Sequence, residues 1–170
     1  MYSDPNSVKR ISSLGAGPIG GGWTAHFLAR GYDVTAYLHD KSETSSFMSI
    51  LKTAWVSLAE LGLAPSASMD RLRIVTDLEE ALDGADFVQE SGPERLEVKQ
   101  KLYSEMGKIL PPSIIIGSST SGLMMSDIQS DCSTPERTVI GHPFNPPYLL
   151  PLVEIVGGKR TAPELSLIHI

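Results

Sequence analysis

A glycine pattern near the N-terminus narrows the possible folds of this chain more than any other feature. It reads Gly15-Ala16-Gly17-Pro18-Ile19-Gly20, a G-x-G-x-x-G between an apolar run over residues 8–14 and a helical pattern over residues 18–30. The first glycine permits a tight turn, the second lets the backbone approach a pyrophosphate, and the third allows a helix to pack closely on a strand. The helix N-terminus then offers free N–H groups to phosphates. The pattern predicts a dinucleotide site, and the alternative is a glycine-rich turn without a ligand.

The rest of the chain alternates strand and helix patterns. Strands are expected over residues 8–14, 33–38, 72–75, 85–89, 114–118, 138–141 and 152–156, and helices over 18–30, 42–61, 77–82, 94–110 and 123–130. This order is typical of a Rossmann-type α/β fold, which is a doubly wound, mainly parallel sheet with helices on both faces. Such sheets bind ligands at the carboxyl ends of their strands, so residues at those ends are the first candidates for a site.

Composition argues against several classes of partner. The net charge of -6 over 170 residues disfavours nucleic acid or an anionic membrane surface as a target. No apolar run reaches the roughly 18 residues of a membrane span, and no signal-peptide pattern opens the chain. Because Cys132 is the single cysteine, no internal disulfide is possible, which fits a reducing, cytoplasmic location. We expect a small-molecule substrate and no metal site.

The last six residues differ in character from those before them. They read Leu165-Ser166-Leu167-Ile168-His169-Ile170. These six residues can be encoded by ctg tct ctt ata cac atc, a string that matches the start of a transposon-tagging sequencing adaptor. We therefore expect residues 1–164 to form one dinucleotide-binding domain and residues 165–170 to be a non-native tail that is kept out of fold reasoning. The alternative is an ordinary short C-terminal strand.

One position of the expected nucleotide site departs from the usual pattern. The second strand of such folds commonly ends in an acidic residue that binds the ribose hydroxyls. Here the end reads Tyr37-Leu38-His39-Asp40, so Leu38 holds that position and Asp40 comes two residues later. A two-residue step keeps the strand face, so Asp40 can replace the acid if the strand runs longer, and it can equally be a helix N-cap. No arginine follows, which favours NAD over NADP.

A histidine and a glutamate flank the last predicted turn of the sheet. His142 follows the strand over residues 138–141 in a proline-rich loop, and Glu154 comes twelve residues later on the next strand. If the loop returns the chain, the carboxylate would lie beside the imidazole, fix its tautomer and raise its basicity, which leaves the other nitrogen as a general base. The alternative for a lone histidine is a structural or merely solvated side chain.

Other polar residues gather at neighbouring strand ends. The run Ser118-Ser119-Thr120-Ser121-Gly122 ends the fifth strand, and it is either part of a site or a turn that caps the next helix. Glu90 and Glu94 lie between the fourth strand and its helix, where acidic side chains also complement a helix dipole without any further function. Lys99, one turn further on, would ordinarily be solvated.

Taken together, these segments resemble the L-3-hydroxyacyl-CoA dehydrogenase family over about residues 8–158. The resemblance implies that His142 is the general acid/base, that Glu154 orients it, and that Ser121 contacts both the substrate hydroxyl and NAD. It further implies that Glu94, Lys99 and Asn145 lie near the nicotinamide and its ribose. It places a helical C-terminal domain, with a catalytic asparagine and the contacts of a homodimer, beyond this chain.

Two classes of substrate are considered, a carnitine-like zwitterion and a 3-hydroxyacyl-CoA. The resemblance is strongest to members of the family that act on L-carnitine, in the segments around Glu90, Glu94, residues 119–122 and residues 142–154. A substrate carrying CoA brings phosphates, yet the helix over residues 42–61 holds only Lys52 as a cation, which favours a carnitine-like zwitterion over a 3-hydroxyacyl-CoA. From another class, a non-catalytic NAD-binding or crystallin-like structural protein is the alternative, against which the retention of His142 and Glu154 counts.

Overall fold

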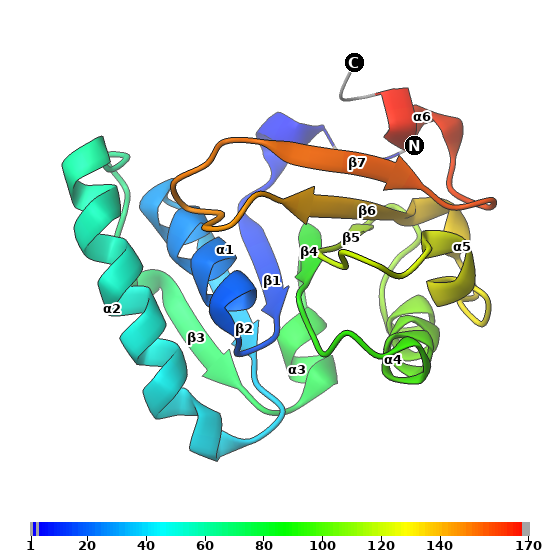
Figure 1. Cartoon of the computed structure of the whole chain (residues 1–170), viewed down its shortest axis with the longest axis horizontal. Coiled ribbons are helices and arrows are strands. Elements are labelled where there is room, and N and C mark those ends of the chain that lie inside the picture. The colour runs from blue at the N-terminus through cyan, green and yellow to red at the C-terminus, as the bar shows by residue number, and fades with distance from the viewer. Residues whose placement is uncertain (1, 3, 168–170) are drawn as a thin grey trace.

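A single seven-stranded sheet organises the chain. The computed structural model describes residue 2 and residues 4–167 (Figure 1). The strands are β1 (Arg10–Leu14), β2 (Asp33–Tyr37), β3 (Leu72–Val75), β4 (Phe87–Glu90), β5 (Ile115–Ser118), β6 (Thr138–Pro143) and β7 (Val153–Gly157). Their order is β3-β2-β1-β4-β5-β6-β7, and all neighbours are parallel except β6 and β7. The predicted doubly wound sheet is confirmed, and its order reverses between β1 and β4.

Helices cover both faces of the sheet, as Figure 1 shows. They are α1 (Pro18–Ala29), α2 (Thr44–Leu61), α3 (Leu78–Leu82), α4 (Leu96–Ile109), α5 (Met125–Ile128) and α6 (Pro163–Leu167), with short 3-10 turns over Pro5–Ser7, Lys41–Glu43, Met69–Arg71 and Pro135–Arg137. Buried side chains of α1 and α2, such as Leu28 and Phe47, pack on one face with Val34 of β2. Those of α3, α4 and α5, such as Met106, pack on the other face with Val88 of β4.

The predicted elements lie within two residues of the observed bounds, and two of the small differences are informative. The sequence places His142 in a loop after the sixth strand, but β6 continues through Pro143 because β7 pairs with it, residue by residue, in antiparallel register. The helix predicted over residues 123–130 is a single turn, α5. Its start is delayed because the N–H of Leu123 donates to Thr120 Oγ1 in the preceding turn.

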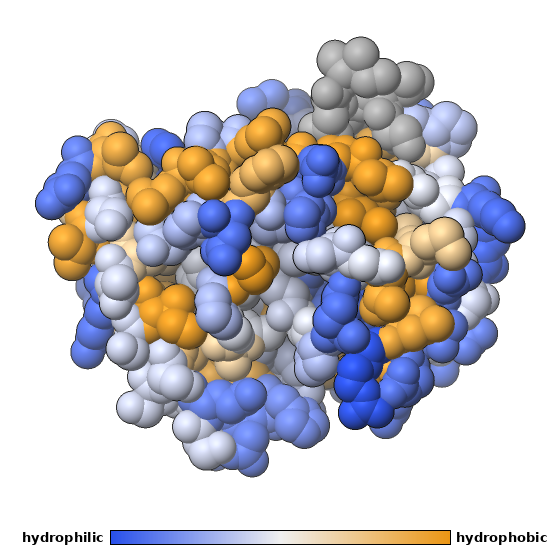
Figure 2. Space-filling view, in the orientation of Figure 1, coloured by the Kyte–Doolittle hydropathy of each residue, from blue (hydrophilic) through white to orange (hydrophobic). Residues whose placement is uncertain are grey.

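The edge of the sheet formed by β7 is apolar and exposed. Figure 2 shows hydrophobic atoms along the side of the molecule where Figure 1 places β7 and the loop that precedes it. The exposed residues of this strip are Leu149, Leu150, Leu152, Val153 and Val156. Among the helices of residues 4–167, none is long and apolar enough to cross a membrane.

The predicted boundary at Leu165 falls inside α6. The N–H of Leu165 donates to the carbonyl of Ala162, and the Leu165 side chain is buried. Ile168, His169 and Ile170 lie outside the described residues, so the proposal of a non-native tail rests on the sequence.

Candidate active site

The glycine turn between β1 and α1 has little room for side chains at its two ends. Gly15 has φ +124°, and a Cβ there would overlap the carbonyl oxygen of Ser91. A Cβ on Gly20 would overlap the carbonyl oxygen of Gly15. Tight turning and close helix–strand approach are therefore the physical reasons for these two glycines, as the sequence predicted.

For the middle glycine, Gly17, neither backbone conformation nor packing within the chain requires the absence of a side chain. A Cβ on Gly17 would meet no atom within 4 Å, and its φ of -75° is accessible to any residue. Gly17 is the N-cap of α1, with no side chain capping the helix, and Pro18 follows in the first turn. An open glycine beside uncapped N–H groups fits the approach of a pyrophosphate, so the residues present suit the dinucleotide that the motif predicts.

The two further glycines of α1, Gly21 and Gly22, serve packing. A Cβ on Gly21 would press on Ile50 of α2, and one on Gly22 would press on Pro147 and Tyr148. The helix that begins the nucleotide site therefore lies directly against the loop that follows His142.

Asp40 is an N-cap, as one of its two interpretations held. Its Oδ1 accepts from the N–H of Ser42 at 2.7 Å, and Oε2 of Glu43 accepts from the N–H of Asp40 at 3.3 Å, a capping box for the 3-10 turn before α2. The hydrogen bonds from Ser42 hold the pKa of the exposed Asp40 carboxyl below its usual value. Leu38, at the expected acidic position, is buried. Contact between Asp40 and a ribose stays a prediction.

His142 and Glu154 are brought together by strand register. They are directly paired residues of β6 and β7, and Nδ1 of His142 lies 3.0 Å from Oε2 of Glu154. The predicted proximity is confirmed. Because an ionised carboxylate only accepts, this bond favours the tautomer with the proton on Nδ1 and leaves Nε2 as an acceptor.

Ser121 completes this group from the end of β5. Its Oγ lies 3.1 Å from Nε2 of His142, on the side of the ring opposite Glu154. The ring is about one-third exposed and Glu154 more so, which leaves the group open to a ligand. A hydroxyl, an imidazole and a carboxylate in line are the arrangement expected for moving a proton to or from a bound hydroxyl.

Glu94 binds the loop that carries Ser121. Its Oε1 accepts from Thr120 Oγ1 at 2.6 Å and from the N–H groups of Ser121 and Gly122, each at 2.9 Å. Partial burial raises the pKa of the Glu94 carboxyl, but these bonds and the nearby Lys99 outweigh it, and the pKa lies below its usual value.

Lys99 is not a solvated helix residue. It is almost fully buried, and its Nζ lies 2.6 Å from Oε1 of Glu90 and 3.8 Å from Oε2 of Glu94. Glu90 also accepts from Ser118 Oγ through its second oxygen at 2.6 Å and from the N–H of Gly92 through its first. Because Glu90 has a partner on each oxygen, its burial is compensated.

The hydroxyl of Ser119 joins three elements, a role that its sequence context does not single out. Oγ of Ser119 accepts from Trp23 Nε1 at 3.2 Å and from Gln89 Nε2 at 2.8 Å, and it lies 2.9 Å from Ser91 Oγ. This ties α1 to the ends of β4 and β5 where the strand order reverses. The only signal for it in the sequence was its place in a run of hydroxyl residues.

Asn145 lines a hollow of about 430 Å³ beside the glycine turn, and neither His142 nor Glu154 is among the lining residues. The hollow is lined by α1, α2 and the loop after β6, through Pro18, Ser46, Ser49, Ile50, Thr53, Asn145, Pro146 and Tyr148. No lining residue carries a formal charge.

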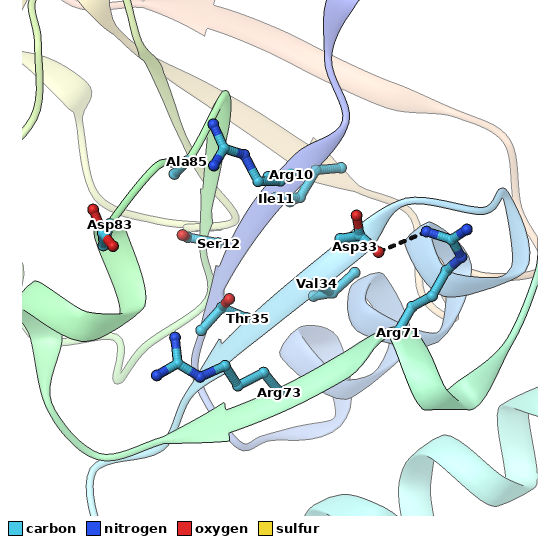
Figure 3. Close-up of a pocket in the computed structure, with 10 residues that line it drawn as sticks. All are labelled: Arg10, Ile11, Ser12, Asp33, Val34, Thr35, Arg71, Arg73, Asp83 and Ala85. Carbon is cyan, nitrogen blue, oxygen red and sulfur yellow. Dashed lines mark hydrogen bonds and ion pairs between the residues drawn. The ribbon is translucent and has the colours of Figure 1, made fainter.

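A second hollow, of about 170 Å³, lies at the amino ends of β1, β2 and β3, away from the glycine turn (Figure 3). Arg71 and Arg73 are among its lining residues, and each pairs with a carboxylate, Arg71 with Asp33 at 2.6 Å and Arg73 with Glu80. These guanidinium groups are neutralised and distant from the polar residues at the carboxyl ends of the strands.

Comparison with known proteins gives a consistent result. Residues 10–167 match the family described as 3-hydroxyacyl-CoA dehydrogenase, NAD binding domain. Curated relatives include L-carnitine dehydrogenases of Streptomyces coelicolor, 51% identical over 160 residues, and of Pseudomonas putida, 50% identical over 157 residues. The alignments cover 94% and 92% of this chain but 50% and 49% of those proteins, so the chain spans about half the length of the curated relatives it matches.

Solved structures agree in fold. A 3-hydroxybutyryl-CoA dehydrogenase from Escherichia coli superposes with a TM-score of 0.84 at 30% identity, covering 94% of this chain and 34% of that one. A pyridine carboxylic acid 5-dehydrogenase, described as an NAD+ dependent dismutase, superposes with a TM-score of 0.85 at 32% identity, covering 95% of this chain and 53% of that one.

Proposed function

The chain belongs to the 3-hydroxyacyl-CoA dehydrogenase family, of which it carries the NAD-binding domain, and we propose that it is the cofactor-binding half of an enzyme that oxidises the hydroxyl group of L-carnitine. The observation that carries the proposal is the alignment of Glu154, His142 and Ser121, with contacts of 3.0 and 3.1 Å, at the carboxyl ends of β5 and β6. The second half present in the relatives would complete the substrate site and hold two copies together.

Each side chain of this group has a separate task in the proposed reaction. Nε2 of His142 takes the proton of the substrate hydroxyl, and Oε2 of Glu154 stabilises the imidazolium that results. Ser121 Oγ, next to Nε2, holds the substrate oxygen in line with the ring. Glycines 15, 17 and 20 seat the pyrophosphate at the start of α1. NAD, when bound, supplies the acceptor for the hydride of the carbinol carbon.

Charge supports a small zwitterion as the substrate over a CoA thioester. The hollow beside the glycine turn has no charged lining residue, and α2 carries only Lys52. The next cations along the chain, Arg71 and Arg73, are paired at the far end of the sheet. The phosphates of CoA would therefore find little counter-charge on this side of the site, whereas carnitine needs none. The names of the curated relatives point to the same substrate.

A chimera tests the proposal. Residues 1–162 of this chain would replace the matching half of the Streptomyces coelicolor relative, and NADH formation would be followed with L-carnitine and with a 3-hydroxyacyl-CoA. We expect turnover of L-carnitine. Preference for the thioester would overturn the substrate, and NADH binding without turnover of either would instead support a non-catalytic NAD-binding protein.

A further inference from the structure

Glu94 makes a set of contacts that a cofactor ligand does not require. Three donors of one turn, Thr120 Oγ1 and the N–H groups of Ser121 and Gly122, converge on its Oε1 at 2.6 to 2.9 Å. One oxygen of Glu94 therefore fixes the backbone on both sides of the Ser121 side chain. A contact with a cofactor would be left to the other oxygen.

The sheet itself does not fix Ser121. β5 ends at Ser118, and α5 begins only at Met125, so the turn between them depends on side-chain acceptors for its order. Ser121 is exposed, which leaves packing little part in orienting its hydroxyl. Glu94 supplies the acceptor that the turn needs.

The position of Glu94 is in turn stabilised by Lys99. Nζ of Lys99 lies 3.8 Å from its second oxygen, and Lys99 is buried against Glu90 on α4 and β4. The position of the carboxylate is thus tied to the core, while its other oxygen reaches the turn.

We propose that Glu94 is a positioning residue, whose bonds to the turn over residues 120–122 fix the Ser121 hydroxyl against Nε2 of His142. The role rests on the proposed function of His142, because only there does the geometry of Ser121 have a chemical consequence. The lowered pKa of the Glu94 carboxyl agrees with it, since hydrogen bonds of this kind favour the ionised form.

The test is nitrogen NMR of the histidine rings in this chain, without cofactor or substrate. Ring nitrogen shifts report the tautomer and the hydrogen bond at Nε2, and His142→Gln assigns the signals of His142. The variants are Glu94→Ala, Ser121→Ala and the two combined. Glu94→Gln keeps an acceptor at Oε1, and Glu97→Ala is the matched control, an exposed glutamate on α4 that bonds only Arg95 among the described residues.

Glu94→Ala and Ser121→Ala are expected to shift the Nε2 signal of His142 in the same direction, and the double variant no further than Ser121→Ala alone. Glu94→Gln is expected to restore the signal, and Glu97→Ala to leave it in place. The amide protons of Ser121 and Gly122 should lose protection in Glu94→Ala only. If Glu94→Ala loses its dispersed spectrum, Thr120→Val replaces it, because this variant removes one of the three bonds. It is expected to shift the Nε2 signal of His142 in the same direction by a smaller amount.

An unchanged His142 signal in Glu94→Ala, or an additive shift in the double variant, would overturn the positioning role. The measurement is independent of turnover. A chimera that fails to oxidise any 3-hydroxy substrate would count against the proposed function alone.

Discussion

The ammonium of Lys99 and Oε1 of Glu90 lie 2.6 Å apart, and both side chains are almost completely removed from solvent. A buried ion pair of this kind is weak evidence of net stabilisation, because desolvation opposes the attraction. Removing one partner has a clearer consequence, since it leaves the other charge buried without compensation.

Lys99→Met should therefore destabilise the fold by about 3–5 kcal/mol. Lys99→Met combined with Glu90→Gln should recover most of that loss, because the amide oxygen can accept from the N–H of Gly92, its NH2 group can donate to Ser118 Oγ, and no charge remains buried. Urea denaturation of the single and double variants gives the coupling energy. Lys101→Met, an exposed lysine of the same helix, is the control, and equal effects at both lysines would contradict the prediction.

Substitutions at the first two glycines of the nucleotide turn should have different effects, one on the stability of the fold and the other on NADH binding. Gly15→Ala is expected to destabilise the fold by about 1–3 kcal/mol, because the position has φ +124° and meets the Ser91 carbonyl. Gly17→Ala should leave thermal stability nearly unchanged and weaken NADH binding by about ten-fold, or about 1.4 kcal/mol. Thermal unfolding and NADH fluorescence titration measure the two effects. Full affinity in Gly17→Ala would mean that phosphates do not approach there.

Asp40→Asn tests the proposed ribose contact with the helix cap left in place. Asparagine caps helices about as well as aspartate, so stability should not change. If the carboxylate binds the ribose hydroxyls, NADH affinity should fall by about ten-fold. Glu43→Gln, the other member of the capping box, is the matched control. Unchanged affinity in Asp40→Asn would leave this residue the task of capping alone.

His142→Ala in the chimera should lower kcat by about 10²–10⁴-fold, the usual loss on removal of a general base. NADH binding to the variant should be retained, because the glycine turn lies on another part of the sheet edge. Steady-state kinetics and a binding titration on the same preparation separate the two. A kcat equal to that of the parent would exclude His142 from the proton transfer.

Acid should weaken the fold through His26. Burial, with a smaller contribution from Arg30, lowers the pKa of this imidazole, whose Nδ1 is buried and finds no partner among the described residues. The unfolded chain therefore takes up a proton near the usual pKa of 6.5 that the folded chain resists, and stability falls as the pH drops below that value. Urea midpoints at about pH 7.5 and about pH 5.5 should differ less in His26→Gln than in the parent. The same pH sensitivity in both would assign it to other groups.

The alternating strands and helices follow from local sequence patterns, and so does the expectation that a returning loop brings Glu154 near His142. The register that pairs the two residues depends on how far β6 extends, and the strand predicted over residues 138–141 stops short of His142. The burial and contacts of single polar side chains do not follow from local patterns either. The sequence pattern predicts that Lys99 lies on the exposed face of its helix. Only the packing of α4 over β4 places it against Glu90. The burial of such a side chain depends on packing between elements that are distant in sequence. The periodicity of residues within one helix carries no information about that packing.

The same reason applies to Ser119. Its hydroxyl contacts Trp23 of α1, Gln89 of β4 and Ser91 just after β4, and these partners lie 96, 30 and 28 residues away along the chain. The place of Asn145 in the hollow beside α1 and α2 likewise depends on how the loop after β6 turns toward α2.

Because β6 and β7 are antiparallel, the loop between them can change in sequence without moving the residues that the two strands pair. The backbone ladder that pairs residues 139–143 with 153–157 holds the histidine and the glutamate opposite each other, whatever the intervening loop contains. That loop also lines the uncharged hollow, through Asn145 and Tyr148. In the proposed enzyme, insertions or substitutions there would alter which molecule is accepted while His142 and Glu154 stay in place, so this loop is a suitable segment in which to engineer a new substrate preference.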